Sequence, residues 1–301
     1  MNAVELRNVT KSFGPTIAVD GLDLDIRQGV IHGFLGPNGS GKTTTIRMIL
    51  SILYPDDGQV SVLGKASAHD SKQRIGYLPE ERGLYPKMKV GAFLSYLASL
   101  KGVPSQGMRD RVLDWLERVE LADKIDTPCE DLSRGMKQKV QTLQALIHQP
   151  DLLILDEPFS GLDPVNRRLM ADLFLAEAER GCTLILCTHM MHHAEELCDH
   201  IVMMNLGRKV LDGPIREVRK LESGILQCEP VSDHDPDSLL SIPGVKSVRR
   251  DAHELRIHLE AGVDGSTLIP DVTRIVPCSR IEIERPSLED VFIETVAKAK
   301  T

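Results

Sequence analysis

The chain has 301 residues, of which 27% are charged and 42% are hydrophobic, and this composition is typical of globular proteins. The length predicts a large domain with a smaller one, or two domains. The formal net charge of −8 and the single tryptophan argue against broad nucleic-acid binding and against a base-stacking platform. Six scattered cysteines without a CxxC pair indicate reduced thiols in a cytosolic protein. We expect no signal peptide and no membrane-spanning helix, because no segment has the necessary apolar run.

The first part of the chain predicts strands followed by a helix. Residues 4–13 alternate apolar and polar side chains, as a half-buried strand does, and residues 18–29 predict a second strand that ends in a turn. Residues 30–36 form a more continuous apolar run, which favours a buried central strand. Residues 37–53 follow with apolar side chains at helical spacing. The pattern therefore predicts a strand, a glycine-rich loop and a helix.

The remaining elements fall into two groups. Residues 90–149 predict mainly helices, and residues 152–156 and 183–187 predict strands joined by a helix that begins near Pro164. Alternating strands and helices favour a largely parallel, covered sheet, so the fold class is α/β. From about residue 223, short runs follow the order strand, helix, strand, strand, helix, strand. This order predicts a small ferredoxin-like α+β module.

The segment GPNGSGKT, residues 36–43, matches the phosphate-binding pattern G-x-x-x-x-G-K-[ST] in full. Glycines let backbone N–H groups approach phosphates, and the following helix adds the positive end of its dipole. Lys42 supplies a charge for the β- and γ-phosphates, and the hydroxyl of Thr43 can bind Mg²⁺. The alternative is a chance match in a glycine-rich turn, which the flanking strand and helix make less plausible. The ATP-binding residues predicted here are Gly36, Pro37, Asn38, Gly39, Ser40, Gly41, Lys42, Thr43 and Thr44.

A second motif, LLILDEP at residues 152–158, places two acids at the end of an apolar strand. Ligands bind at the carboxyl ends of strands in open α/β sheets. There Asp156 would hold Mg²⁺ through its water shell, and Glu157 would accept a proton from an attacking water. The alternative is an ordinary strand end with solvated acids, and the upstream phosphate loop argues against it.

Further motifs resemble those of the ATP-binding cassette (ABC) family, specifically the ATPase subunits of ABC transporters. LSRGMKQK at residues 132–139 resembles the family signature LSGGQ, and SGLDP at residues 160–164 resembles the D-loop. His189 resembles the switch histidine, and Phe13 stands where the family stacks an aromatic ring on adenine. These motifs follow the family order over roughly the first 220 residues.

The resemblance implies a P-loop NTPase cassette with a mixed sheet core and a helical subdomain at about residues 88–149. This cassette would span residues 1–222, and a C-terminal accessory domain would span residues 223–301. The family pairs two such domains head to tail, as a homodimer or with a second ABC subunit, around two ATP molecules.

The family also implies a role for particular residues. Lys42, Thr43, Asp156, Glu157 and His189 of one subunit would contact ATP and its Mg²⁺. Ser133 and Gly135 of the other subunit would contact the same ATP. Lys42, Glu157 and His189 would be catalytic, and Asp163 would lie near the shared interface.

The chain departs from the family pattern at three positions. Arg134 replaces the first signature glycine and Met136 replaces the glutamine, while Gly135 is kept. Glu80 stands where the family has a glutamine that reaches the Mg²⁺ and the attacking water. Glutamate keeps an oxygen for the metal but loses the amide donor, so we expect Glu80 to face the metal and Glu81 a partner.

Other polar clusters have simpler explanations. His189, His193 and Cys198 could form a zinc site, but we expect His192 and His193 to be surface residues and Cys198 a packed thiol. Cations near the signature could bind nucleic acid, but we expect Lys137 and Lys139 to face solvent or phosphate.

The expected function is that of an ATPase subunit, peripheral on the cytoplasmic face of the cell membrane, that powers a separate permease. YLPEERGLYPKM, LSRGMKQK and PSLEDVFIE resemble the sodium-extruding and ABC-2-type exporters. The alternative is a soluble ABC ATPase that acts in translation or DNA maintenance, which the single phosphate loop disfavours. A GTPase or kinase is disfavoured because the guanine-reading NKxD pattern is absent and because the signature has no role in those proteins. No nucleic-acid partner is expected.

Overall fold

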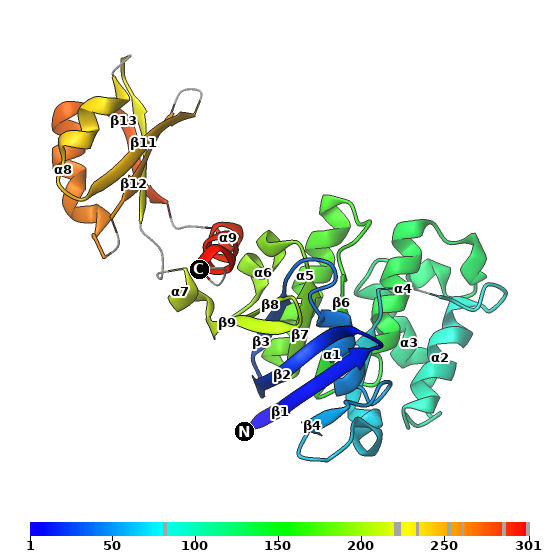
Figure 1. The fold of residues 1–301 in the computed structure, drawn as a ribbon. Helices are drawn as coiled ribbons and strands as arrows, with labels where there is room; N and C mark the ends of the chain where they lie inside the picture. The colour runs from blue at the N-terminus through cyan, green and yellow to red at the C-terminus, as the bar shows by residue number, and fades with distance from the viewer. Residues whose placement is uncertain are drawn as a thin grey trace. The chain divides into compact units, whose positions relative to one another are not determined.

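A computed structural model describes residues 1–80, 83–219, 224–232, 235–251, 254–260, 262–284 and 287–298. The chain divides into two units, residues 1–212 and residues 213–301 (Figure 1). The predicted boundary between residues 222 and 223 falls outside the described residues, and it remains a prediction.

The centre of the first unit is a six-stranded sheet of order β5–β6–β7–β3–β8–β9. Its strands are β3 (Ile31–Leu35), β5 (Ile75–Leu78), β6 (Leu152–Asp156), β7 (Thr183–Thr188), β8 (His200–Asn205) and β9 (Arg208–Pro214). The first five strands of that order pair in parallel. β3, β6 and β7 are buried along their whole length, which explains why their sequences are continuously apolar rather than alternating. The predicted parallel, covered sheet is confirmed.

A smaller antiparallel sheet of order β2–β1–β4 completes the sheet structure of this unit. Its strands are β1 (Asn2–Phe13), β2 (Thr16–Arg27) and β4 (Asp57–Val62). Leu22, Leu24 and Ile26 alternate with exposed residues along β2 and belong to one apolar cluster with residues of the parallel sheet. The two sheets therefore share a core, which also includes Ile46 and Ile49 of the helix α1 (Lys42–Ile49).

The other helices of the first unit include three that form the helical subdomain, all within the predicted range 88–149. They are α2 (Val90–Leu100), α3 (Met108–Glu117) and α4 (Arg134–Leu146). The remaining helices are α5 (Pro164–Glu179), α6 (Met191–Leu197) and the 3-10 helices η1 (Ala68–Arg74), η2 (Ala122–Lys124) and η3 (Cys129–Asp131). Asp163 caps α5, accepting a 2.9 Å hydrogen bond from the backbone N–H of Asn166. Pro164 follows at the first helical position, where the missing N–H costs nothing.

The second unit contains a four-stranded antiparallel sheet of order β11–β12–β10–β13. Its strands are β10 (Ile225–Pro230), β11 (Val245–Asp251), β12 (Glu254–Leu259) and β13 (Cys278–Glu284), and its helices are α7 (Ile215–Val218), η4 (Pro236–Ser241), α8 (Gly265–Ile275) and α9 (Leu288–Lys298). The predicted order of elements is confirmed, except that the first helix is the 3-10 helix η4. Leu239 of η4 and Val272 of α8 pack on the sheet in one apolar cluster. Among the described residues, none of the helices combines the length and the apolar character needed to cross a bilayer.

Candidate nucleotide-binding site

The phosphate loop joins the carboxyl end of β3 to the first residue of α1, as its sequence predicts. Two of its glycines leave no room for a side chain. Gly36 has φ +149°, and an added Cβ would lie 2.3 Å from the carbonyl oxygen of Met204. Gly41 has φ +103°, and an added Cβ would lie 2.4 Å from the carbonyl oxygen of Ala18. Backbone from the neighbouring strands therefore fixes the curvature of the loop.

The side chain of Lys42 folds back over this loop. Its Nζ donates hydrogen bonds to the carbonyl oxygens of Gly36, at 2.7 Å, and Pro37, at 3.0 Å, and the residue is only 8% exposed. The buried Oγ of Ser40 has no hydrogen-bond partner among the described residues. The loop thus holds a cation and an unsatisfied hydroxyl close together, an arrangement that suits a phosphate group.

The other residues predicted for the loop and for adenine lie nearer to solvent. Pro37, Asn38 and Gly39 are exposed at the tip of the loop, and Thr43 and Thr44 are half-buried in the first turn of α1. Phe13 ends β1 with its side chain 51% exposed, and Nζ of Lys11 lies 5.8 Å from its ring centroid.

Asp156 ends β6, the strand next to β7 in the parallel sheet. The residue is 2% exposed, and its Oδ2 has no hydrogen-bond partner among the described residues. Burial raises the pKa of Asp156, and the charges of Glu80 and Glu157 raise it further, against the lowering effects of the Cys187 thiol and Lys42. A cation beside Oδ2 would relieve this concentration of negative charge.

Glu157 is held by the strand that ends next to it. Its Oε1 accepts hydrogen bonds from the backbone N–H of His189, at 2.9 Å, and from Nδ1 of His189, at 2.6 Å. Its Oε2 accepts a 3.0 Å bond from Oγ1 of Thr188. A carboxylate oxygen has two lone pairs, and the bond from Thr188 uses one of those on Oε2. The backbone of Glu157 has φ +48°, a strained conformation often found at functional sites.

Glu80 follows β5, which pairs with β6 so that Leu78 lies opposite Leu155. The side chain of Glu80 is exposed, and its negative charge raises the pKa of Asp156. The structure therefore brings Glu80 to the same edge of the sheet as the acid after β6. Glu81, expected to face a partner, lies outside the described residues.

The signature-like residues lie on a different element from the phosphate loop. Ser133 is exposed and caps α4, accepting a 3.3 Å hydrogen bond from the backbone N–H of Met136. An added Cβ at Gly135 would lie 3.8 Å from Nδ2 of Asn166, which also hydrogen-bonds Asp163. Ser133, Gly135 and Asp163 thus form one surface. Among the described contacts, none joins these residues to the phosphate loop.

Comparisons with known proteins cover both units. A family model described as "ABC transporter" matches residues 19–160, and "ATP-binding protein DrrA1-3-like, C-terminal domain" matches residues 213–296. The ABC transporter ATP-binding protein YhaQ of Bacillus subtilis is 40% identical over 96% of this chain and 97% of its own length. The chain belongs to the ABC transporter ATP-binding protein family. The Nod factor export ATP-binding protein I of Burkholderia orbicola is a more distant relative, 33% identical over 98% of this chain and 97% of its own length.

Solved structures of ABC proteins share the fold of the first unit. The ATP-binding subunit of an ABC transporter has a TM-score of 0.67 and 26% identity, covering 72% of this chain and 92% of that chain. The protein cbiO1 from Clostridium perfringens has a TM-score of 0.65 and 28% identity, covering 72% of this chain and 90% of that chain. The chain is therefore an ABC subunit that binds and hydrolyses ATP. The alternative of an ABC ATPase that acts in translation or DNA maintenance is not favoured, because the relatives are transporter subunits.

Two predictions about polar residues of this ABC ATPase are wrong. His193 was expected at the surface but is 3% exposed, because α6 turns it toward Phe159, whose ring centroid lies 4.8 Å away. Lys139 was expected to face solvent or phosphate but is 6% exposed, and its Nζ donates a 3.1 Å hydrogen bond to the carbonyl oxygen of Val119. Both side chains are buried by elements distant in the sequence. Cys198 is a buried thiol, as expected.

Three further residues support the site and were not anticipated. Thr188 holds Glu157, and the Cys187 thiol hydrogen-bonds Asp156. Nε2 of Gln138 on α4 donates a 2.5 Å hydrogen bond to the carbonyl oxygen of Pro158. Thr188 and Cys187 could have been predicted from the sequence, because they lie at the carboxyl end of a parallel strand, where ligands bind. Nothing local in the sequence points to Gln138.

The residues at this edge fit a magnesium ion. The buried, unpartnered oxygen of Asp156 is a hard ligand of the type that Mg²⁺ prefers. The Thr43 hydroxyl and the Glu80 carboxylate would supply further oxygens. Among the described residues, no group of three or more histidine, cysteine or acidic side chains could hold a metal by itself. Mg²⁺ in such sites commonly relies on few protein ligands together with nucleotide phosphates and water.

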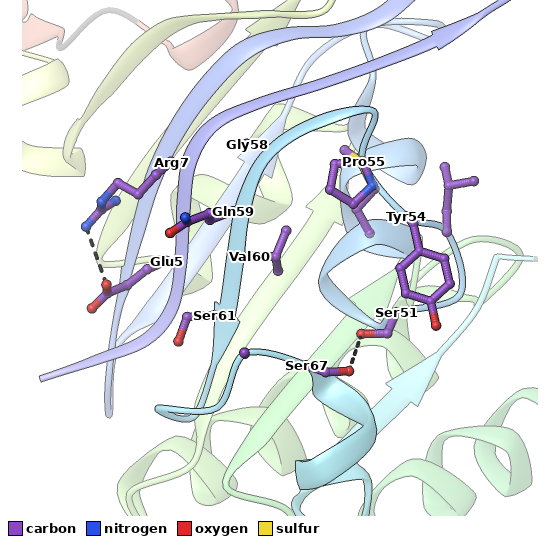
Figure 2. A pocket seen from close by; sticks show the side chains of 13 residues that line it. Glu5, Arg7, Ser51, Tyr54, Pro55, Gly58, Gln59, Val60, Ser61 and Ser67 are labelled. Carbon is purple, nitrogen blue, oxygen red and sulfur yellow. Dashed lines mark hydrogen bonds and ion pairs between the residues drawn. The ribbon is translucent and has the colours of Figure 1, made fainter.

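A separate cavity of about 490 Å³ is lined by residues of β1 and β4, by the segment that follows α1, and by residues 66–67 before η1 (Figure 2). Its rim carries an ion pair between Glu5 and Arg7, at 3.6 Å, and a hydrogen bond between Ser51 and Ser67, at 3.1 Å. None of the predicted site residues lines it. The cavity therefore lies apart from the nucleotide site.

Proposed function

We propose that this ABC ATPase uses ATP to drive export through a separate membrane permease, from the cytoplasmic face of the membrane. The observation that carries the proposal is the gathering of Lys42, Asp156 and the hydrogen-bonded pair of Glu157 and His189 at the carboxyl edge of the parallel sheet. Export is supported by the relative named for Nod factor export. The resemblance of YLPEERGLYPKM and PSLEDVFIE to sodium-extruding and ABC-2-type exporters supports the same direction.

Within the site, this chain's residues would divide the work. The backbone N–H groups of residues 36–44 and Nζ of Lys42 bind the phosphates, and the exposed ring of Phe13 stacks on adenine. Thr43, Glu80 and Asp156 would hold Mg²⁺, which would supply positive charge to neutralise the phosphate oxygens. Oε2 of Glu157 accepts a proton from the attacking water.

His189 has a positioning role. Its Nδ1–H donates to Oε1 of Glu157 and so fixes the orientation of that carboxylate. Because no described contact joins Ser133 or Gly135 to the phosphate loop, these residues would act on ATP held by another subunit. We infer that two copies, or this chain and a second ABC subunit, enclose two ATP molecules, with Asp163 at the interface.

The test is to isolate the chain from its native membrane with a mild detergent and identify what accompanies it. A multi-spanning protein should co-purify in fixed stoichiometry, and its presence should stimulate ATP hydrolysis by the complex. The Lys42→Ala variant is the matched control, since it should retain the membrane partner but lose ATP-dependent dimerisation. Recovery of the chain with ribosomes or DNA, and without a membrane protein, would contradict the proposal.

A further inference from the structure

Arg134, the residue that replaces a signature glycine, lies against the loop that follows Glu157. Gly161 in that loop has φ +76°, and an added Cβ would lie 2.8 Å from Nη2 of Arg134. The same Cβ would lie 3.0 Å from both Cζ and Nε of Arg134. Three guanidinium atoms lie at nearly equal distances from this Cβ position. The flat face of the guanidinium group therefore covers the position that a side chain of residue 161 would occupy. A side chain at position 161 would displace the guanidinium group from this position, and it would also have to adopt an unfavourable positive φ.

Among the described residues, electrostatics gives Arg134 no other role. It is the first residue of α4, and the first turn of this helix has no acidic residue. A cation at the positive end of a helix dipole is unfavourable rather than stabilising. In the described part of the chain, no carboxylate lies within ion-pair distance of Arg134. The packing on Gly161 is therefore the interaction that accounts for the orientation of its side chain.

A second contact from the same face of α4 reaches the same loop. Gln138 lies one turn after Arg134, so the two side chains project in similar directions. Gln138 is 6% exposed, and its Nε2 donates the 2.5 Å bond to the carbonyl oxygen of Pro158. The segment between Pro158 and Gly161 is thus held by α4 at two points, one buried and one at the surface.

That segment connects the predicted base to the interface. Glu157 precedes it, with its backbone in the strained φ +48° conformation, and Asp163 follows it as the cap of α5. A backbone that is strained at one end and capped at the other has few alternative conformations. A displacement of the α4 N-terminus would therefore be transmitted to Glu157 rather than absorbed in between.

We propose that Arg134 is a positioning residue that couples the signature-like turn to Glu157 of its own subunit. This inference rests on the proposed dimer, in which that turn contacts the ATP of the other subunit. ATP bound at one site would then set the geometry of the base at the other site. Hydrolysis should consequently be cooperative in ATP concentration, and Arg134 should be needed for the cooperativity.

The experiment measures ATPase rate against ATP concentration for wild type, Arg134→Ala and Arg134→Lys, with nucleotide affinity measured separately by a fluorescent ATP analogue. We expect the Hill coefficient, which two coupled sites limit to about 2, to fall toward about 1 in Arg134→Ala, with a roughly tenfold lower kcat. Affinity for the analogue should stay within about twofold, because Lys42 and the phosphate loop are unchanged. Arg134→Lys should not restore cooperativity, because lysine keeps the charge but lacks the planar group.

The matched control is Arg168→Ala, which removes an exposed cation of α5 that pairs only with Asp172, at 3.3 Å, among the described residues. It should leave the Hill coefficient and kcat unchanged. Full cooperativity in Arg134→Ala, or its rescue by Arg134→Lys, would overturn the inference by showing that the contact is dispensable or that charge alone matters. A wild-type chain that hydrolyses ATP without cooperativity and never dimerises would instead contradict the proposed dimer.

Discussion

The two units of this ABC subunit differ most in what they bury. Among the described residues, every buried polar or charged side chain lies in the first unit, including Lys42, Asp156 and Glu157. The apolar cluster of the second unit is built from aliphatic side chains and Cys228. Burying polar groups costs free energy unless they are paired. The many buried polar side chains of the first unit therefore indicate that this unit contains the functional site.

The backbone shows the same contrast. In the described ranges, the non-glycine residues with positive φ are all in the first unit. Those residues are Asn8, Ser51, Leu63, Glu120, Gln149, Glu157 and Leu206. Only Glu157 among them is a predicted catalytic residue, so strain by itself does not identify the site. At Glu157 a strained backbone coincides with a buried, hydrogen-bonded carboxylate, and this combination does identify the site.

The largest effect on ATP hydrolysis is expected in the first unit, from substitution of the predicted catalytic base Glu157. Glu157→Gln should lower kcat by on the order of 10²- to 10⁴-fold, because an amide cannot accept the proton from water. ATP binding should persist, and ATP-bound dimers should accumulate in size-exclusion chromatography. Glu179→Gln, at an exposed position at the end of α5, is the control and should hydrolyse ATP normally. Normal turnover in Glu157→Gln would assign the base elsewhere.

A smaller effect is expected from the shape of the phosphate loop. Gly41→Ala combines the unfavourable φ of +103° with a collision 2.4 Å from the carbonyl oxygen of Ala18, so the loop must move. We expect ATP affinity to fall by at least about tenfold, equivalent to about 1.4 kcal/mol. Gly29→Ala separates the two causes, because Gly29 has φ +71° but no atom within 4 Å of an added Cβ. Gly29→Ala should destabilise the fold by about 1–2 kcal/mol and leave ATP affinity unchanged. Equal affinities in both variants would refute the steric explanation.

The first unit should also lose stability in mild acid. His32 is 1% exposed, and its burial lowers the pKa of the imidazole to about 4. In the unfolded chain the pKa is about 6.5, so the unfolded state binds more protons between these values and stability falls as the pH drops through them. At pH 5 the loss from His32 is about 2 kcal/mol.

Denaturant unfolding at pH 7 and pH 5 measures this loss. His32→Gln should reduce the difference between the two pH values, since the titrating ring is gone. His69→Gln replaces an exposed histidine and should leave the difference as in wild type. An unchanged difference in His32→Gln would assign the pH dependence to other groups.

The smallest effect on nucleotide chemistry is expected from the core of the second unit. Leu255 is fully buried in its apolar cluster, so Leu255→Ala should cost about 2–5 kcal/mol of that unit's stability. ATP affinity of the first unit should not change, because the site residues all lie in the first unit. Leu240→Ala, at a 46% exposed position, is the control for both measurements. A parallel loss of ATP affinity in Leu255→Ala would show that the two units are not separable in function.

Much of the fold follows from local sequence patterns. The continuous apolar runs of β3, β6 and β7 predicted buried strands, and the alternating pattern of β1 predicted a half-buried strand. The phosphate loop was predictable because glycine and lysine at fixed spacing serve one local geometry. The 3-10 helix η4 was harder to predict, since a run of a few residues satisfies more than one helical geometry.

The sequence by itself determined the order of the elements, the phosphate loop, and Asp156 and Glu157 at the end of their strand. Only the tertiary structure decided which distant side chains support them. In the folded chain His193 and Lys139 are buried, and Glu157 is hydrogen-bonded to Thr188 and His189. Arg134 packs against Gly161. The physical reason is that periodicity and turn chemistry act over a few residues, whereas burial and hydrogen-bond pairing depend on neighbours that only the folded chain brings together.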